Sequence, residues 1–190
     1  YKWIVDPIDG TTVFSNGLPD FGVMLALMKE GQPIFGAISL PAQGEMISAM
    51  KGRGVTLTSL KSGEVRSITK NDMQQRILSQ SIVAYDVGYK NKANLTMSIV
   101  NKVSEKVGAL VSYFSSSHSN FRLANGQLAA SIHTEPKIFD IAPASVIIEE
   151  LGGKVTQMDG SPVDWTKEKN SYLAALNTAH HQELVDLLNS

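Results

Sequence analysis

The chain has 190 residues, of which 43% are hydrophobic and 18% charged, and its net charge is −1. These values are typical of a soluble globular protein, and the near-neutral charge argues against nucleic acid or an anionic membrane as a partner. The chain has no cysteine, which excludes disulfides and thiolate chemistry. No apolar run reaches the ~18 residues of a membrane span, so we expect no membrane partner and a cytoplasmic protein.

The first part of the chain predicts a meander of antiparallel strands. Short apolar runs separated by turn residues indicate strands at 2–5, 21–29, 33–40, 45–50, 55–60 and 65–68. Asp6-Pro7 should end the first of them, because the residue before a proline is restricted in its backbone geometry. The chain starts at Tyr1, directly in an apolar strand, so we expect a preceding segment that is not represented here.

The second part predicts alternating strands and helices. Strands are expected at 81–85, 110–114, 154–157 and 172–175, and helices at 93–107, 121–130, 139–151 and 179–188. The pattern indicates an α/β protein of the α+β kind with stacked layers of helix and sheet. We expect one unit, 1–190, with an antiparallel half (1–75) and an α/β half (76–190) that meet at a polar stretch near 69–80.

A string of polar residues directly follows the first strand: Asp6-Pro7-Ile8-Asp9-Gly10-Thr11-Thr12. A turn there can bring the two carboxylates together with the Ile8 carbonyl, and such oxygens are hard ligands that suit Mg²⁺ or Mn²⁺. The glycine and its neighbours can offer backbone N–H groups to an anion, and a threonine hydroxyl can orient a water. Ordinary surface turns are the alternative, but the complete string after an apolar strand favours a metal site.

A further carboxylate stands at the start of a later predicted helix, in the string Phe139-Asp140-Ile141-Ala142-Pro143-Ala144. As an N-cap, Asp140 would be stabilised by free N–H groups and by the helix dipole, and Pro143 would fit the first turn. A cap is the ordinary role of such a residue. Asp140 is also a candidate metal ligand, because the first string lacks a carboxylate from elsewhere in the fold.

These two strings resemble the two signatures of the inositol monophosphatase family. Further matches fall in the family's order: Asn16-Gly17-Leu18-Pro19, Glu45, Gly52-Arg53-Gly54 and Glu149-Glu150-Leu151-Gly152-Gly153. The resemblance covers essentially the whole chain. It implies a layered αβαβα sandwich, N-terminally incomplete because the family's first helices have no counterpart in this sequence. Without those helices we expect an exposed apolar face and loosened metal binding.

The resemblance also implies hydrolysis of a small phosphate monoester, assisted by two or three Mg²⁺ ions, with Mn²⁺ as a possible substitute. The implied metal ligands are Asp6, Asp9, Asp140 and the Ile8 carbonyl. Thr11 and Asp9 would be the catalytic residues that act on the attacking water. The substrate would be bound by Gly10, Thr11, Thr12, Ser116, His133 and Asp140. A homodimer and inhibition by lithium are further family expectations.

Some positions depart from the family pattern. A metal-binding Glu lies upstream in family members and has no match here. His133 stands where inositol-specific members carry a Glu, and Ser116 belongs to a serine-rich stretch that either lines the pocket or forms a solvated loop. Inositol monophosphate or a similar polyol or sugar phosphate is therefore the leading substrate. The alternatives are histidinol phosphate, a nucleotide 3′-phosphate, and a catalytically impaired regulatory or scaffold role.

Overall fold

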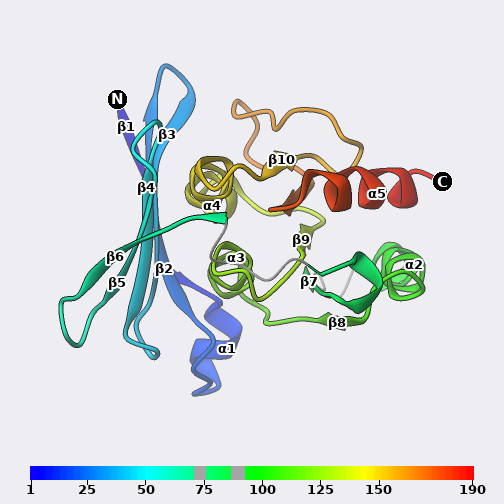
Figure 1. Cartoon of the computed structure of the whole chain (residues 1–190), viewed down its shortest axis with the longest axis horizontal. Helices are drawn as coiled ribbons and strands as arrows, with labels where there is room; N and C mark the ends of the chain where they lie inside the picture. The colour runs from blue at the N-terminus through cyan, green and yellow to red at the C-terminus, as the bar shows by residue number, and fades with distance from the viewer. Residues whose placement is uncertain (71–75, 87–92) are drawn as a thin grey trace.

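The computed structural model of the chain describes residues 1–70, 76–86 and 93–190 (Figure 1). Its strands form a six-stranded sheet in the first part of the chain and a five-stranded sheet in the second. Part of the polar stretch that was predicted to separate the two halves, residues 71–75 of 69–80, lies outside the described residues.

The first sheet is an antiparallel meander in which strands pair in their chain order. It comprises β1 (Lys2–Asp9), β2 (Gly22–Lys29), β3 (Gln32–Leu40), β4 (Glu45–Met50), β5 (Val55–Ser59) and β6 (Val65–Ile68). The predicted strands agree closely, except that β1 does not stop at Asp6-Pro7 but continues to Asp9. The short helix α1 (Thr11–Ser15), which was not predicted, follows it directly.

The second sheet is mixed, and its strands lie in the order β10-β11-β9-β7-β8. Their bounds are β7 (Ile82–Asp86), β8 (Ala109–Val111), β9 (Ala130–His133), β10 (Lys154–Thr156) and β11 (Tyr172–Ala175). Its helices are α2 (Ala93–Ser104), α3 (Ser116–Ala124), α4 (Ile138–Glu150) and α5 (Thr178–Leu188), and a short 3₁₀ turn, η2 (Leu78–Gln80), precedes β7. The helix predicted at 121–130 was wrong in its bounds: α3 begins five residues earlier, and its predicted end belongs to β9.

The elements stack in layers (Figure 1). Helices α3 and α4 lie between the two sheets, and α2 and α5 cover the far face of the second sheet. This arrangement confirms the predicted layered α/β fold. Within the described residues no helix covers the outer face of the first sheet, so the layers run sheet, helix, sheet, helix. None of the helices in this part of the chain is long and apolar enough to span a membrane.

The largest core cluster joins both sheets through the middle helices. It contains Met24 and Ile38 of the first sheet and Phe121 and Ile147 of α3 and α4, all fully buried. Helix α4 approaches β3 so closely that a Cβ added at Gly36 would lie 2.1 Å from the carbonyl oxygen of Pro143. Pro143 had been expected in the first turn of the helix, but it lies further inside α4.

Candidate metal centre

A bulge in β1 brings Asp6 and Asp9 to the same side of the strand. Residues three apart on a regular strand point to opposite faces, because successive side chains alternate. Asp6 pairs with Met24 and Asp9 with Gly22, so three steps along β1 face only two along β2. The extra residue re-aims the second side chain, as bulges do next to functional sites. Pro7 therefore lies in a bulge and not in a turn that ends the strand.

The N-terminus of α3 holds the Asp9 carboxylate. Its Oδ2 accepts hydrogen bonds from the Ser115 hydroxyl (2.6 Å) and from the Ser117 backbone N–H (2.7 Å), and its Oδ1 accepts one from the Ser116 N–H (3.3 Å). The carboxyl is buried, with 6% of the residue exposed. The first N–H groups of a helix lack partners within the helix, so they are free to stabilise an ionised carboxylate.

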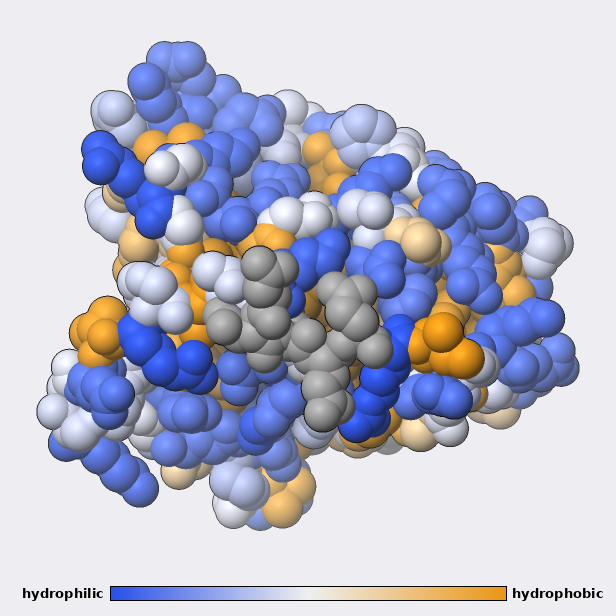
Figure 2. Space-filling view, in the orientation of Figure 1, coloured by the Kyte–Doolittle hydropathy of each residue, from blue (hydrophilic) through white to orange (hydrophobic). Residues whose placement is uncertain are grey.

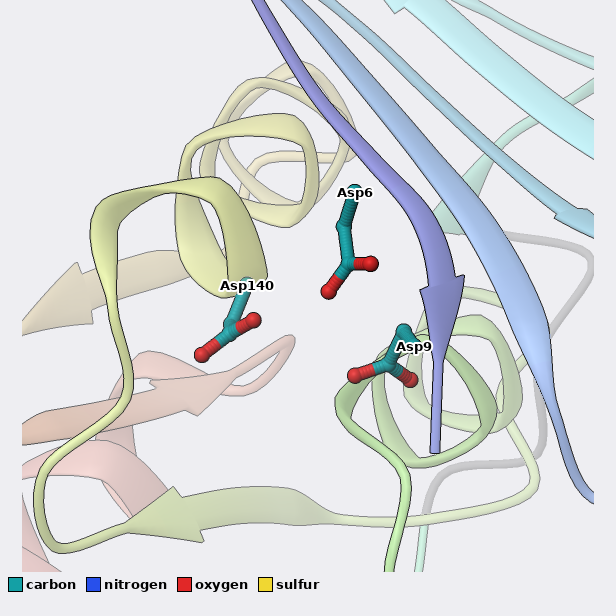
Figure 3. Close-up of side chains that lie close together, drawn as sticks. All are labelled: Asp6, Asp9 and Asp140. Carbon is teal, nitrogen blue, oxygen red and sulfur yellow. The ribbon is translucent and has the colours of Figure 1, made fainter. Parts of the chain in front are cut away.

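Asp140 projects from the first turn of α4 toward the two carboxylates of β1 (Figure 3). It is not the N-cap that the sequence had suggested. Lys137 takes that position, and the Asp140 Oδ2 accepts the Lys137 backbone N–H at 2.7 Å. Asp140 thus satisfies one of the unpaired donors at the helix start, as the third residue of a capping box does, while it still faces the acidic cluster.

Oxygen atoms of Asp6, Asp9 and Asp140 all lie within 4.8 Å of one another. Burial raises the pKa of Asp140 to about 7, and the charges of Asp9 and Asp6 act in the same direction. Burial and the charge of Asp9 also raise the pKa of Asp6. Three carboxylates so placed repel one another unless a proton or a cation lies between them. Their oxygens are the ligands that Mg²⁺ prefers, so these residues fit the predicted ion.

The predicted phosphate-binding segment follows this cluster directly. Gly10 has a φ of +78°, a conformation that favours glycine, and it precedes the first helical residue of α1. A Cβ at Gly10 would lie 2.9 Å from that of Ser115, the residue that binds Asp9. Thr11 and Thr12 begin α1 with exposed side chains, and Ile8, next to Asp9, is half-buried. Their predicted roles toward phosphate, water and metal stay predictions.

Ser116 and His133 lie beside the acidic cluster, both buried. Besides its N–H bond to Asp9, Ser116 places its hydroxyl 3.5 Å from Nδ1 of His133. Ser116 is therefore part of a helix and not of a solvated loop. Ser115 and Ser117 belong to the serine-rich stretch for which a place at the pocket was one of the two predictions, whereas that Asp86 belongs to this neighbourhood was not predicted. Ser115 is the N-cap of α3 and accepts the His118 N–H, and a serine before a helix was the one signal that could have revealed it.

A cluster of carboxylates from β1 and α4 gives this layered α/β protein a candidate metal centre. A model of the inositol monophosphatase family matches residues 1–190, and the chain belongs to this family. It is 32% identical over 191 residues to inositol monophosphatase 2 of Solanum lycopersicum, covering 98% of this chain and 68% of that protein. It is 30% identical over 199 residues to a histidinol-phosphatase of Streptomyces coelicolor, covering 99% of this chain and 69% of that protein.

A solved structure supports the fold. The crystal structure of an IMPase/NADP phosphatase complexed with Mg²⁺ and phosphate matches with a TM-score of 0.81 and 24% identity, over 99% of this chain and 66% of that one. The chain thus spans about two thirds of the length of each of these three proteins.

Proposed function

We propose that this chain carries the metal- and phosphate-binding centre of a phosphatase that hydrolyses a small phosphate monoester. Inositol monophosphate or a similar polyol or sugar phosphate is the proposed substrate. The observation that carries the proposal is the cluster of Asp6, Asp9 and Asp140, whose oxygens lie within 4.8 Å of one another. Family membership over residues 1–190 supports the same reaction class.

In this proposal Asp6, Asp9, Asp140 and the Ile8 carbonyl hold Mg²⁺, two or three ions in all. Bound Mg²⁺ would supply charge that polarises the phosphoryl group and lowers the pKa of a water. Gly10, Thr11 and Thr12 bind the phosphate through backbone N–H groups, and the Thr11 hydroxyl orients the attacking water. The hydrogen bonds from α3 hold the Asp9 carboxyl in place. The proposal extends to a cytoplasmic homodimer that lithium inhibits.

Histidinol phosphate is the second candidate substrate. The histidinol-phosphatase relative aligns over 99% of this chain, and the family resemblance places His133 where a Glu is expected in inositol-specific members. A nucleotide 3′-phosphate and a regulatory or scaffold role have less support. A scaffold has no physical need for three converging carboxylates or for the hydrogen bonds that hold Asp9.

The test is phosphate release from inositol monophosphate, histidinol phosphate and a nucleotide 3′-phosphate with Mg²⁺, comparing the chain with its Asp9→Asn variant. We expect release that the variant lowers by at least about a hundredfold, because the substitution removes a charged ligand from the centre. Glu183→Gln, which removes a carboxylate on α5, is the matched control and should retain full activity. Absence of release from all three esters, with no stabilisation by Mg²⁺ in thermal melts, would favour the scaffold role.

A further inference from the structure

The second sheet presents a polar row to the middle helices, opposite the acidic strand of the first sheet. Asp86 pairs with His133 across β7 and β9, and His133 pairs with Tyr172 across β9 and β11. Side chains alternate along a strand, and Ala84 of β7 belongs to the core between the sheets while Val83 and Tyr85 belong to the outer core. Asp86 therefore points to the same side as Ala84, toward the layer that contains α3 and α4.

A short chain of contacts connects Asp86 with the candidate metal centre. The Asp86 Oδ2 lies 3.0 Å from the His133 Nδ1, and the same nitrogen lies 3.5 Å from the Ser116 hydroxyl. The Ser116 N–H donates to Asp9. Two residues, His133 and Ser116, thus link the Asp86 carboxylate with that of Asp9, one of the candidate metal ligands.

His133 has no free nitrogen for a ligand. Its Nε2 lies 2.8 Å from the Ser131 hydroxyl, its Nδ1 faces Asp86, and the residue is 2% exposed. An ionised carboxylate only accepts hydrogen bonds, so the proton between the two lies on Nδ1. His133 thereby fixes one oxygen of Asp86. The Asp86 side chain is 25% exposed, and within the described residues no second hydrogen bond or ion pair engages it.

We propose that Asp86 is a specificity-determining residue of this site, which accepts a hydrogen bond from a hydroxyl or ammonium group on the alcohol part of the substrate. This inference rests on the proposed phosphatase function and narrows it. A carboxylate at this place favours polyol and amino-alcohol phosphates and disfavours esters with a second anionic group there, since like charges repel. His133 is the positioning residue that orients Asp86.

Three phosphonates of matched size test the inference without turnover: 2-aminoethylphosphonate, 2-hydroxyethylphosphonate and propylphosphonate. Their C–P bond is not a phosphate ester, and they differ only in an ammonium, hydroxyl or methyl end. We expect calorimetry with Mg²⁺ to show that the first two bind the unmodified chain about tenfold more tightly than the third, the size of one hydrogen bond to a charged group. Asp86→Ala should abolish this preference and leave propylphosphonate binding unchanged.

Asp86→Asn separates the two donor types and protects the test against misfolding of the alanine variant. Its single oxygen stays with the His133 N–H, so an NH2 group faces the ligand. A hydroxyl can accept a hydrogen bond from that group and should retain most of its affinity, whereas an ammonium cannot, and the ammonium ligand should lose about tenfold. Glu135→Ala is the control: it removes a carboxylate two residues beyond His133, half exposed and 3.8 Å from Lys169. The Glu135→Ala variant should keep the preference for the ammonium and hydroxyl ligands. If it loses that preference, the effect of Asp86→Ala reflects the loss of a negative charge in general and not a contact made by Asp86, which would overturn the inference.

Equal weakening of all three phosphonates in Asp86→Ala would overturn the inference, because it would place Asp86 in support of the metal centre. Absence of any preference in the unmodified chain, or of any binding at all, would overturn it as well. Phosphate release from inositol monophosphate by the unmodified chain is measured in parallel. Release without a phosphonate preference defeats only the specificity role, whereas a preference without release defeats only the proposed catalytic function.

Discussion

The two sheets of this protein are covered differently. In the second sheet, β9 and β11 are buried along their whole length between the middle helices and the outer pair α2 and α5. In the first sheet, β1 and β2 alternate between buried and more exposed residues, and Trp3 and Val5 are 57% and 51% exposed. Apolar side chains gather at the surface of this sheet, at the left of Figure 2.

The sequence of β1 and β2 does not match this one-sided coverage. A strand with one solvated face usually alternates apolar and polar residues, whereas strands buried on both faces are nearly continuous apolar runs. Trp3-Ile4-Val5 and Val23-Met24-Leu25-Ala26-Leu27-Met28 are runs of the second kind. The first sheet thus has an inner face that is fixed by packing and presents the candidate metal ligands of β1. The side chains of its outer face are partly apolar, and no described layer covers them. The inner face should tolerate far less change than the outer one.

Gly36→Val should have the largest effect, because it fills the closest approach between the first sheet and α4. The added Cβ would lie 2.1 Å from the Pro143 carbonyl oxygen, so the helix or the strand must shift. We expect a loss of roughly 3 kcal/mol or more in the free energy of unfolding, measured by urea titration. Ser39→Val places the same valine side chain on the outer face of the same strand and should change the free energy of unfolding by about 0.5 kcal/mol or less. Equal losses for the two variants would contradict the comparison.

Asp140→Asn, on the helix α4 that packs between the two sheets, should raise the stability of the metal-free protein and weaken its binding of metal. Folding raises the pKa of Asp140 from 3.8 to about 7, so the folded state binds the proton more tightly and loses stability as the pH rises through that window. Asparagine does not ionise. The metal-free variant should therefore melt at a higher temperature than the unmodified chain at pH 8, and the difference should vanish near pH 4.

The same variant should lose the stabilisation that Mg²⁺ gives the unmodified chain, because a ligand is gone. Thermal melts with and without Mg²⁺ at both pH values measure the two effects together. Glu183→Gln on α5 removes a carboxylate outside the cluster and should show neither change. If the metal-free Asp140→Asn variant is less stable than the unmodified chain at pH 8, the ionised Asp140 carboxylate stabilises the fold. That result would contradict the inferred repulsion between the three carboxylates.

Much of the first sheet could be predicted because its strands are local apolar runs joined by short turns. The bulge at Pro7 could not, since a proline after Asp6 is compatible with both a chain turn and a bulge, and only pairing with β2 distinguishes them. Helix α3 was misplaced for a different reason. Its first five residues, 116–120, are polar yet buried between two sheets, so no apolar stripe marks them.

The site shows the same division between local and long-range information. Asp6 and Asp9 stand in one string with Asp140 in another, and residue chemistry alone made them candidates. The serines that hold Asp9 are more than 100 positions away from it, at separations of 106 to 108 residues. Asp86 lacks any motif, and its contact with His133 depends on a parallel pairing between β7 and β9. Such contacts depend on topology, which a single sequence does not state.

The smallest expected effect is the most direct test of how the two sheets differ. Val5→Thr and Val83→Thr exchange a methyl for a hydroxyl without a change of size, the first on the outer face of β1 and the second on β7. Val5 is 51% exposed and Val83 fully buried. A buried hydroxyl without a partner costs about 1–3 kcal/mol, whereas an exposed one remains hydrated. Val83→Thr should therefore lower the free energy of unfolding by about that amount in urea titrations, and Val5→Thr by about 0.5 kcal/mol or less.

A comparable loss at Val5 would mean that the outer face of the first sheet is covered in solution, for example by a second copy of the chain. In that case the loss at Val5 should shrink on dilution, because the stability of an associating protein depends on its concentration.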